Sequence, residues 1–411
     1  MRFVKSFVIT LFSQGVIIVT GFLNGVIITR NLGPGGRGEY AMVSFMVTII
    51  LVLMGEGLYR SNIYLASRDK SEQNLAQLGS NILVYGVLVA LIMLLLGLLP
   101  DRVYAVLMPG IKPVYIYLGL GTTLAFIMNR QFQGLFLGLQ KFWHYNLLNS
   151  LPIVLFLVLD FSVLIITRNL TTFKVLTNFF LSMLAVAVLG FYLYYRPRGL
   201  RILPDAAAIR QSLFYGWRAT LAYLLIFLLI RLNLYIVNYA FGVAQAGLFA
   251  VAVNIATLIQ RVPNVASVVL LPRVSERETT RKLALTTKVA AVSLLFCVAS
   301  AAFFYFAGEQ LLIWLYKEAF AKSYQPLVWL LPGIIVFSIA GIYNTALWGQ
   351  GFPPITIWAP LAALLADLIA CALLIPSGGI VGAAQAATVS YVVFGAVVFG
   401  YVYWNRKSLN R

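Results

Sequence analysis

The sequence predicts an all-α polytopic membrane protein with about twelve transmembrane helices. Apolar stretches of about 20 residues fill nearly all of the 411-residue chain, and about 20 residues of α-helix span a hydrocarbon core of about 30 Å. A segment surrounded by lipid must satisfy its own backbone hydrogen bonds, which a helix does. The composition agrees, because 61% of the residues are hydrophobic and only 10% are charged, whereas soluble domains carry about a quarter charged residues.

The expected spans follow one another with short connections. The first follows a basic start that resembles a signal peptide, but no A-x-A cleavage motif precedes Thr29, so we expect an uncleaved span. The longest outer loop, Gly308–Tyr324, mixes aromatic and charged residues and suggests an interfacial helix, with a small folded loop as the alternative. In chain order the spans are 7–29, 40–65, 78–99, 114–137, 143–167, 173–195, 213–238, 246–271, 283–307, 325–349, 353–375 and 380–404.

Lysine and arginine residues predict the orientation of the chain in the membrane. With both termini in the cytoplasm, the cytoplasmic segments carry about twice as many of these residues as the outer segments, which follows the positive-inside rule. The net charge of +18 is then a consequence of membrane orientation, and no nucleic-acid partner is expected. We expect a multi-pass protein of the plasma membrane (the inner or cell membrane) with cytoplasmic termini.

The longest polar break divides the chain into two equal sets of spans. It begins with Arg-Pro-Arg-Gly-Leu-Arg and continues through Pro204-Asp205 to a helix start. The expected organisation is a six-helix N-terminal lobe at 1–195, a cytoplasmic linker at 196–212 and a six-helix C-terminal lobe at 213–411.

The two halves resemble each other weakly. Two glycines of the first inter-span turn align with two glycines of the matching turn in the second half, at an offset of 209 residues. Six is an even number of spans, so we expect parallel repeats with a cavity at their interface. The aligned pairs are Gly33 with Gly242, Gly38 with Gly247, Asn24 with Asn233 and, at an offset of 207, Asp160 with Asp367.

Several motifs resemble those of a known family. L-G-P-G-G-R-G-E-Y at 32–40 resembles the first turn of O-antigen and polysaccharide flippases (Wzx-like transporters) in the MATE-like multidrug/oligosaccharidyl-lipid/polysaccharide (MOP) superfamily. The segments similar to their eighth span, tenth span and last junction are 247–254 with 271–275, 330–335, and 375–391. The chain departs from the family pattern at Asn233, where many members carry Asp, and at Asp367, where many carry Asn.

The resemblance implies both a fold and an activity. The fold is two six-helix lobes in a V around a central cavity. The activity is the movement of a polyprenyl-diphosphate-linked oligosaccharide from the cytoplasmic to the outer leaflet by alternating access, for cell-surface polysaccharide such as the O-antigen of lipopolysaccharide. The partners would be this lipid-linked substrate, the bilayer and the polysaccharide polymerase machinery, and we expect a monomer without a cofactor.

A diphosphate headgroup needs a cationic path through the membrane, and six cations lie inside expected spans. Four of them sit near cytoplasmic span ends and have snorkelling as an equal alternative, and an i,i+4 pair with Glu56 is a further alternative for one, Arg60. Two lie deeper, and these are the main candidates for the cavity. The four are Arg60, Arg130, Arg218 and Lys288, and the two are Arg231 and Arg261.

Other polar residues within the spans are candidates for coupling and for sugar contacts. The candidates for ion coupling are Asp160, Asp367 and Glu56, with structural pairing to arginine or simple protonation of the buried acid as alternatives. The candidates for sugar binding or gating are Asn24, Asn233 and Gln14, with interhelical hydrogen bonding as the alternative.

The sequence offers no catalytic constellation and no metal site. His144 is the only histidine, both cysteines lie inside expected spans, and G-P-G-G-R-G lacks the ending of a Walker loop. We therefore expect a transporter. Three alternatives stay open: a MATE-type drug or ion antiporter, a lipid II flippase, which commonly has two extra spans, and a membrane O-antigen polymerase or ligase, which typically needs a larger outer loop.

Overall fold

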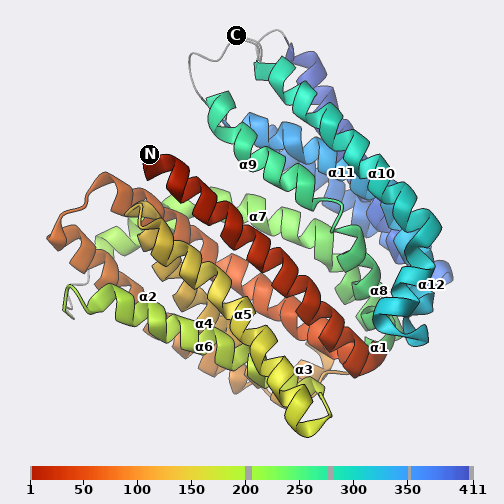
Figure 1. Cartoon of the computed structure of the whole chain (residues 1–411), viewed down its shortest axis with the longest axis horizontal. Helices are drawn as coiled ribbons and strands as arrows, with labels where there is room; N and C mark the ends of the chain where they lie inside the picture. Colours follow the sequence, from red (N-terminus) through yellow and green to blue (C-terminus); the bar gives the residue numbers. More distant parts are fainter. Residues whose placement is uncertain (1, 200–205, 276–281, 350–352, 407–411) are drawn as a thin grey trace. The chain divides into compact units, whose positions relative to one another are not determined.

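The computed structural model describes residues 2–199, 206–275, 282–349 and 353–406 (Figure 1). Almost all of these residues lie in helices, and none of the described residues lies in a β-strand. Eight of the described helices are long and apolar enough to cross a membrane, and a ninth span is formed if one bent helix pair is counted. The prediction of an all-α polytopic membrane protein is confirmed.

The chain divides into two compact units, and each has one helix at its centre. Unit 1 comprises Met1–Leu32 and Glu39–Leu224, and unit 2 comprises Gly33–Gly38 and Leu225–Arg411. This division falls inside a helix, whereas the lobe limits 1–195 and 213–411 and the linker 196–212 remain predictions about the membrane topology.

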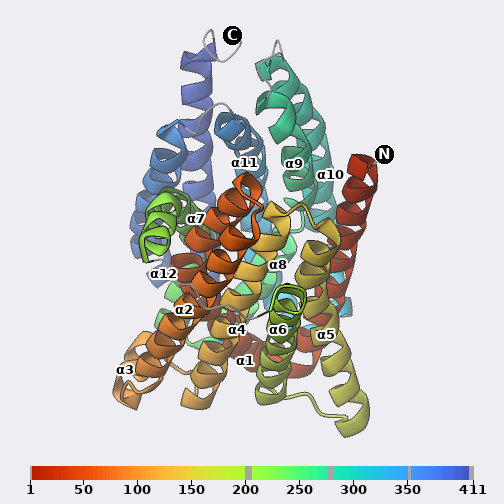
Figure 2. The ribbon, with the colours of Figure 1, turned by 90° about the vertical axis from the view of Figure 1, so that its left-hand side faces the viewer.

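Unit 1 is organised around α4, which contacts α2, α5 and α6 (Figure 2). Side-chain caps fix two helix starts, because Ser71 accepts from the Asn74 amide before α2 and Thr171 accepts from the Lys174 amide before α6. The helices of this unit are α1 (Arg2–Arg68), α2 (Glu72–Gly97), α3 (Asp101–Leu107), α4 (Pro113–Gly138), α5 (Phe142–Thr167), α6 (Thr172–Tyr195) and the first part of α7 (Ala206–Phe241).

Unit 2 is organised around α11, which contacts α8, α9, α10 and α12. Its helices are the rest of α7, α8 (Val243–Ala256), α9 (Arg261–Ser275), α10 (Lys282–Tyr316), η1 (Glu318–Ser323), α11 (Tyr324–Gly349) and α12 (Ile355–Trp404). The separate interfacial helix expected after the ninth span is absent from the described residues. Instead α10 continues to Tyr316 and only the short 3₁₀ helix η1 follows, because the aromatic and leucine residues there extend the apolar run of α10.

The twelve expected spans all fall within described helices. α1 holds two of them, joined through a kink at Gly33, and α12 holds two joined through a kink at Gly379. One span consists of α8 and α9, whose axes are bent by 50°. Pro263 explains this bend, because it has no N–H to donate to the preceding turn of an uninterrupted helix. The large exposed fractions of apolar side chains such as Leu95 (65%) and Leu295 (73%) suit contact with lipid.

The two glycine turns have the same backbone conformation. Gly33 has φ 66° and ψ −177°, and Gly242 has φ 83° and ψ 173°, a region that side chains disfavour. Five residues further on, Gly38 and Gly247 lie in close contact with the opposite turn. The match at an offset of 209 residues therefore extends from the sequence to the backbone, and it supports the internal repeat.

Candidate functional site

Three arginines of unit 2 form a group that we call the basic cluster: Arg37, Arg231 and Arg261. Arg231 projects from α7, Arg261 is the first residue of α9, and Arg37 follows the Gly33 kink. The charges of Arg37 and Arg261 lie close enough to act on Arg231. Such a concentration of like charge in an apolar helical unit is unfavourable unless an anion joins it.

The partner of Arg231 leaves its charge uncompensated. Its Nη1 donates a hydrogen bond to Asn254 Oδ1 at 3.3 Å, and Asn254 is neutral. No carboxylate forms an ion pair with Arg231 or Arg261 in the part of the chain that the structure describes. The two guanidinium groups are therefore suited to a ligand with several anionic oxygens.

The break between α8 and α9 adds to this site. It places Arg261 at the start of a helix, where the helix dipole also favours an anion. Because Pro263 requires the break, the local sequence positions the arginine and exposes the helix start together.

A buried acid, Asp367, interacts electrostatically with the same tyrosine as Arg231 of the basic cluster. Asp367 on α12 is fully buried, and its Oδ1 accepts a hydrogen bond from Asn233 Nδ2 at 3.1 Å. Cys371 Sγ donates to Asn233 Oδ1 at 2.8 Å. Tyr391 is close enough to interact electrostatically with both Asp367 and Arg231. The acid and the basic cluster are therefore linked within one unit.

Unit 1 contains the counterpart of this acid. Asp160 on α5 is also fully buried, and its Oδ1 accepts a hydrogen bond from Asn178 Nδ2 at 2.8 Å. Asn24 on α1 is the second amide beside the Asp160 carboxyl. The two aspartate–asparagine pairs that align in the sequence are thus two sets of spatial neighbours, one in each unit. In both, the second carboxyl oxygen, Oδ2, lacks a hydrogen bond of good geometry to any described residue.

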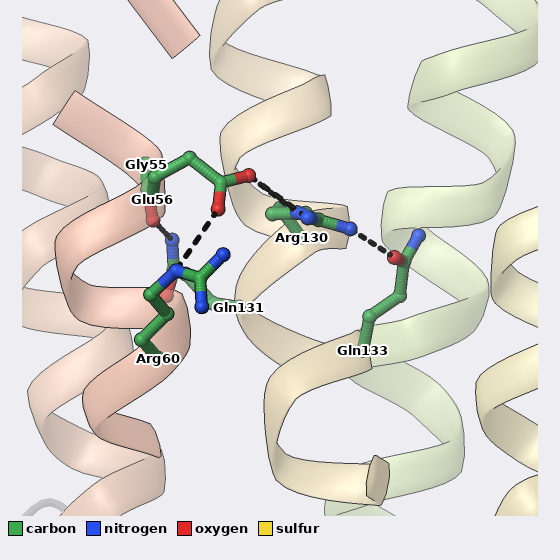
Figure 3. Close-up of polar contacts among 6 residues, drawn as sticks. All are labelled: Gly55, Glu56, Arg60, Arg130, Gln131 and Gln133. Atoms are coloured by element: carbon green, nitrogen blue, oxygen red, sulfur yellow. Dashed lines mark hydrogen bonds and ion pairs between the residues drawn. The ribbon is translucent and has the colours of Figure 1, made fainter. Parts of the chain in front are cut away.

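A second group of charged residues lies around Glu56 in unit 1 and is drawn in Figure 3. Arg130 donates two hydrogen bonds to Glu56 Oε1, from Nη2 at 2.8 Å and from Nε at 3.0 Å. Its Nη1 donates to Gln133 Oε1 at 3.3 Å, and its guanidinium lies 3.8 Å from the centre of the Tyr59 ring. Arg130 is therefore satisfied within the protein.

Arg60 shares the same carboxylate more loosely. Its Nε lies 3.8 Å from Glu56 Oε2, and its guanidinium lies 4.5 Å from the centre of the Tyr223 ring. The pairing of Glu56 with Arg60, weighed from the sequence, is present, but Arg130 joins it from α4. Two arginines and one carboxylate leave this group with one net positive charge.

Three candidates from the sequence remain, and the structure describes the side chains of two of them. Lys288 is exposed on α10, as a snorkelling lysine would be. Gln14 is half-buried on α1. Arg218 lies in α7, but its side chain is outside the described residues.

Arg37 was not predicted as a site residue from the sequence, because it was counted among the cations of the outer loops. Its side chain is 6% exposed. The repeat contained a signal that would have found it, because its counterpart at the offset of 209 residues is Ala246, which is fully buried. A position that holds a core residue in one half is expected to be enclosed in the other.

The sequence also matches a described protein family. The match is to the family "Polysaccharide biosynthesis protein" and covers residues 3–278, which is more than half of the chain. The chain belongs to this polysaccharide biosynthesis protein family. Comparison with curated protein sequences gave no match.

Solved structures show which fold this family member has. It is similar to the lipid II flippase MurJ in an inward closed conformation, with a TM-score of 0.82, 11% identity, and coverage of 97% of this chain and 87% of that chain. It is also similar to an inward-facing multidrug resistance MATE transporter of the MOP superfamily, with a TM-score of 0.77, 15% identity and 98% coverage of both chains. A MOP superfamily transporter from Pyrococcus furiosus follows at a TM-score of 0.60, 14% identity, and coverage of 98% of this chain and 95% of that chain.

These identities establish the fold alone, and the fold is the one expected. The family match confirms a polysaccharide biosynthesis protein, and the structural matches confirm that its fold is the one found in MurJ and in MATE transporters. The three solved neighbours are described as transporters or as a flippase, so the family member has a transporter fold in a multi-pass membrane protein.

Proposed function

We propose that this protein is a flippase that moves a polyprenyl-diphosphate-linked oligosaccharide from the cytoplasmic to the outer leaflet by alternating access. The observation that carries the proposal is that Arg231 and Arg261, two members of the basic cluster, have no carboxylate partner among the described residues of this polysaccharide biosynthesis protein. Arg231 and Arg261 bind the diphosphate, and Arg37 adds to the positive electrostatic potential around it.

The chemistry of the headgroup suits these residues. A diphosphate presents several anionic oxygens, and a guanidinium donates paired hydrogen bonds to two of them at once. Moving a charged group into hydrocarbon is costly, so binding to the cluster lowers the barrier to crossing. The polyprenyl tail is as apolar as the bilayer and stays in it. The oligosaccharide travels with the headgroup.

The cations of unit 1 have a secondary part in this proposal. The Glu56 group keeps one net positive charge, and Arg60, with 35% of its side chain exposed, is its more accessible member. Arg130 acts mainly by holding Glu56. Arg218 and Lys288 remain candidates for guiding the anion at the cytoplasmic side.

The buried acids are the proposed coupling groups. An isolated carboxylate is unfavourable in an apolar interior, so Asp160 and Asp367 hold a proton or a monovalent cation while they are enclosed. The electrostatic interaction of Tyr391 with both Asp367 and Arg231 gives the bound ion and the bound diphosphate a means of influencing each other. Glu56 is a weaker candidate because two arginines already occupy it. The amides of Asn24 and Asn233 already interact with the carboxyl groups of Asp160 and Asp367. Gln14 is therefore the remaining candidate for sugar contact.

The remaining expectations complete the proposal. The protein works as a monomer in the plasma membrane, with both termini in the cytoplasm. The lipid-linked oligosaccharide that it delivers to the outer leaflet is then used by polysaccharide polymerase machinery. A lipid II flippase is the second candidate, because the similarity to MurJ has a TM-score of 0.82 and lipid II is also a polyprenyl diphosphate. A drug exporter for organic cations is less consistent with the basic cluster.

Reconstituted translocation tests the proposal. Proteoliposomes receive a fluorescent polyprenyl-diphosphate oligosaccharide in one leaflet, and its arrival in the other is followed by quenching. We expect movement by the wild type, loss of at least ten-fold with Arg231→Ala and with Arg261→Ala, and little change with Arg102→Ala, which removes an exposed arginine of α3, as the control. Lipid II serves as the competing substrate. A wild type that moves neither lipid but exports a cationic dye would overturn the proposal.

A further inference from the structure

Unit 2 contains a cavity of about 700 Å³ that neither the basic cluster nor Asp367 lines. Its wall comes from the end of α7, the start of α8, the segment from α10 through η1 to α11, and the kink of α12. The volume is typical of small-ligand sites, which measure about 300–1,000 Å³. The polar and aromatic residues of the wall are Phe241, Gln245, Glu309, Lys322, Tyr324 and Gln325.

The wall is held in place by contacts outside the cavity. The Tyr324 hydroxyl donates a hydrogen bond to the Tyr305 carbonyl oxygen at 2.5 Å, which fixes the ring. Phe320 in η1 is 1% exposed, and its ring centre lies 5.9 Å from that of Tyr316. This anchor fixes the short helix that carries Lys322. The cavity is therefore a built feature of unit 2 and needs no ligand to form.

The polar side chains of the cavity are available for binding. Gln245, Glu309, Lys322 and Gln325 make no side-chain hydrogen bond or ion pair with any residue that the structure describes. The two carboxamides offer donors and acceptors, the carboxylate accepts, and the ammonium group donates. A ligand that fills the cavity thus meets both hydrogen-bond donors and hydrogen-bond acceptors on several sides.

This set of side chains matches the chemistry of a sugar. Each sugar hydroxyl both donates and accepts, and the apolar face of a pyranose ring packs on an aromatic side chain such as Phe241 or Tyr324. Glu309 and Lys322 carry opposite charges, so the cavity has no net preference for an anion or a cation. A phospholipid headgroup offers few donors and would leave the carboxamides unsatisfied.

We propose that this cavity binds one or two sugar units of a neutral or zwitterionic oligosaccharide at the outer side of the membrane. The choice of side rests on the orientation in the proposed function, in which the Gly242 turn and the connection from α10 through η1 to α11 are outer connections. A sugar held there has left the transport path, so binding opposes its return to the cytoplasmic side.

Two glycines of α12 make the proposal testable. Gly378 and Gly379 line the cavity, and a Cβ at either would meet no atom within 4 Å. Gly379 has φ +56°, so a substitution there would strain the kink. Gly378 has no such restriction, so Gly378→Leu adds an apolar side chain at the cavity wall. Gly400→Leu is the matched control, because Gly400 lies in the same helix with open space around it and does not line the cavity.

The experiment measures sugar binding directly and separately from transport. The full chain, purified in a detergent without a sugar headgroup, is applied to a microarray of neutral, amino and acidic oligosaccharides. We expect binding to neutral or zwitterionic members, at least ten-fold weaker binding by Gly378→Leu and by Gln325→Ala, and wild-type binding by Gly400→Leu.

Several results would overturn the assignment: no binding by the wild type, equal binding by Gly378→Leu, equal loss with Gly400→Leu, binding confined to acidic sugars, or displacement of the sugar by phosphatidylethanolamine vesicles. Translocation of the diphosphate lipid is measured in parallel. Translocation without sugar binding would sink the cavity proposal alone, and sugar binding without translocation would sink the flippase proposal alone.

Discussion

Gly38 and Gly247 pack reciprocally against each other's turns. A Cβ added to Gly38 would lie 1.8 Å from the Val243 carbonyl oxygen, and one added to Gly247 would lie 1.9 Å from the Pro34 carbonyl oxygen. Pro34 and Val243 are themselves related by the offset of 209 residues, so the two contacts are copies of one another. Backbone touches backbone at this crossing, and only glycine leaves room for it.

The first prediction concerns this crossing. Gly38→Ala and Gly247→Ala should each destabilise the protein by at least about 3 kcal/mol, because a backbone cannot move aside as a flexible side chain does. Thermal unfolding of the purified protein measures the effect. Gly35→Ala in the same turn is the control, since its Cβ would meet nothing within 4 Å. Equal stability of Gly38→Ala and Gly35→Ala would contradict the packing described.

The second prediction concerns the ion pair between Glu56 and Arg130. Arg130→Gln should destabilise the protein by about 3 kcal/mol, because it leaves the 7%-exposed Glu56 carboxylate with only the distant Arg60. The double variant Glu56→Gln/Arg130→Gln should lose less than the sum of the single variants. Pulse proteolysis of all four proteins gives the coupling energy. A coupling of zero would show that the two hydrogen bonds contribute nothing to stability.

The third prediction concerns the geometry of the Arg231 side chain. Arg231→Lys keeps the positive charge but loses the two-pronged donor of the guanidinium. We expect translocation at about a tenth of the wild-type rate, above that of Arg231→Ala, with unchanged thermal stability. Initial rates in proteoliposomes provide the measurement. Full activity with lysine would mean that charge alone suffices at this position.

The fourth prediction concerns Asp367. Asp367→Asn keeps the size of the side chain and an acceptor for Asn233 Nδ2 but removes the titratable group. We expect a folded protein whose translocation no longer responds to an imposed proton or sodium gradient. Asp160→Asn tests the counterpart in unit 1. If both variants and the double variant kept the wild-type response to the gradients, neither acid would be the coupling group.

Much of the architecture was predictable because it depends on local properties of the chain. Span length and apolarity are read along the sequence, and each expected span corresponds to a described helix or, for 246–271, to the bent pair α8 and α9. The repeat was also readable, since Gly33 and Gly242 need the same rare backbone conformation. The prediction of a separate interfacial helix after the ninth span was wrong, because the apolar run to Tyr316 continues α10.

The site was only partly predictable, because partners distant in the sequence depend on packing. The pairing of Glu56 with Arg60 follows from helical spacing, but Arg130 reaches Glu56 across 74 residues. Arg37 reads as an outer loop residue until the Gly33 kink and the close contact with α8 enclose it.

The sequence by itself determined a polytopic helical membrane protein with two related halves, because apolar length and repeated glycines act locally. Only the tertiary structure decided which charges are compensated. Arg130 has a carboxylate and Arg231 has a neutral amide, although both look alike as arginines in apolar spans. The physical reason is that the energy of a buried charge depends on the atoms around it, and those atoms come from helices that are far apart in the chain.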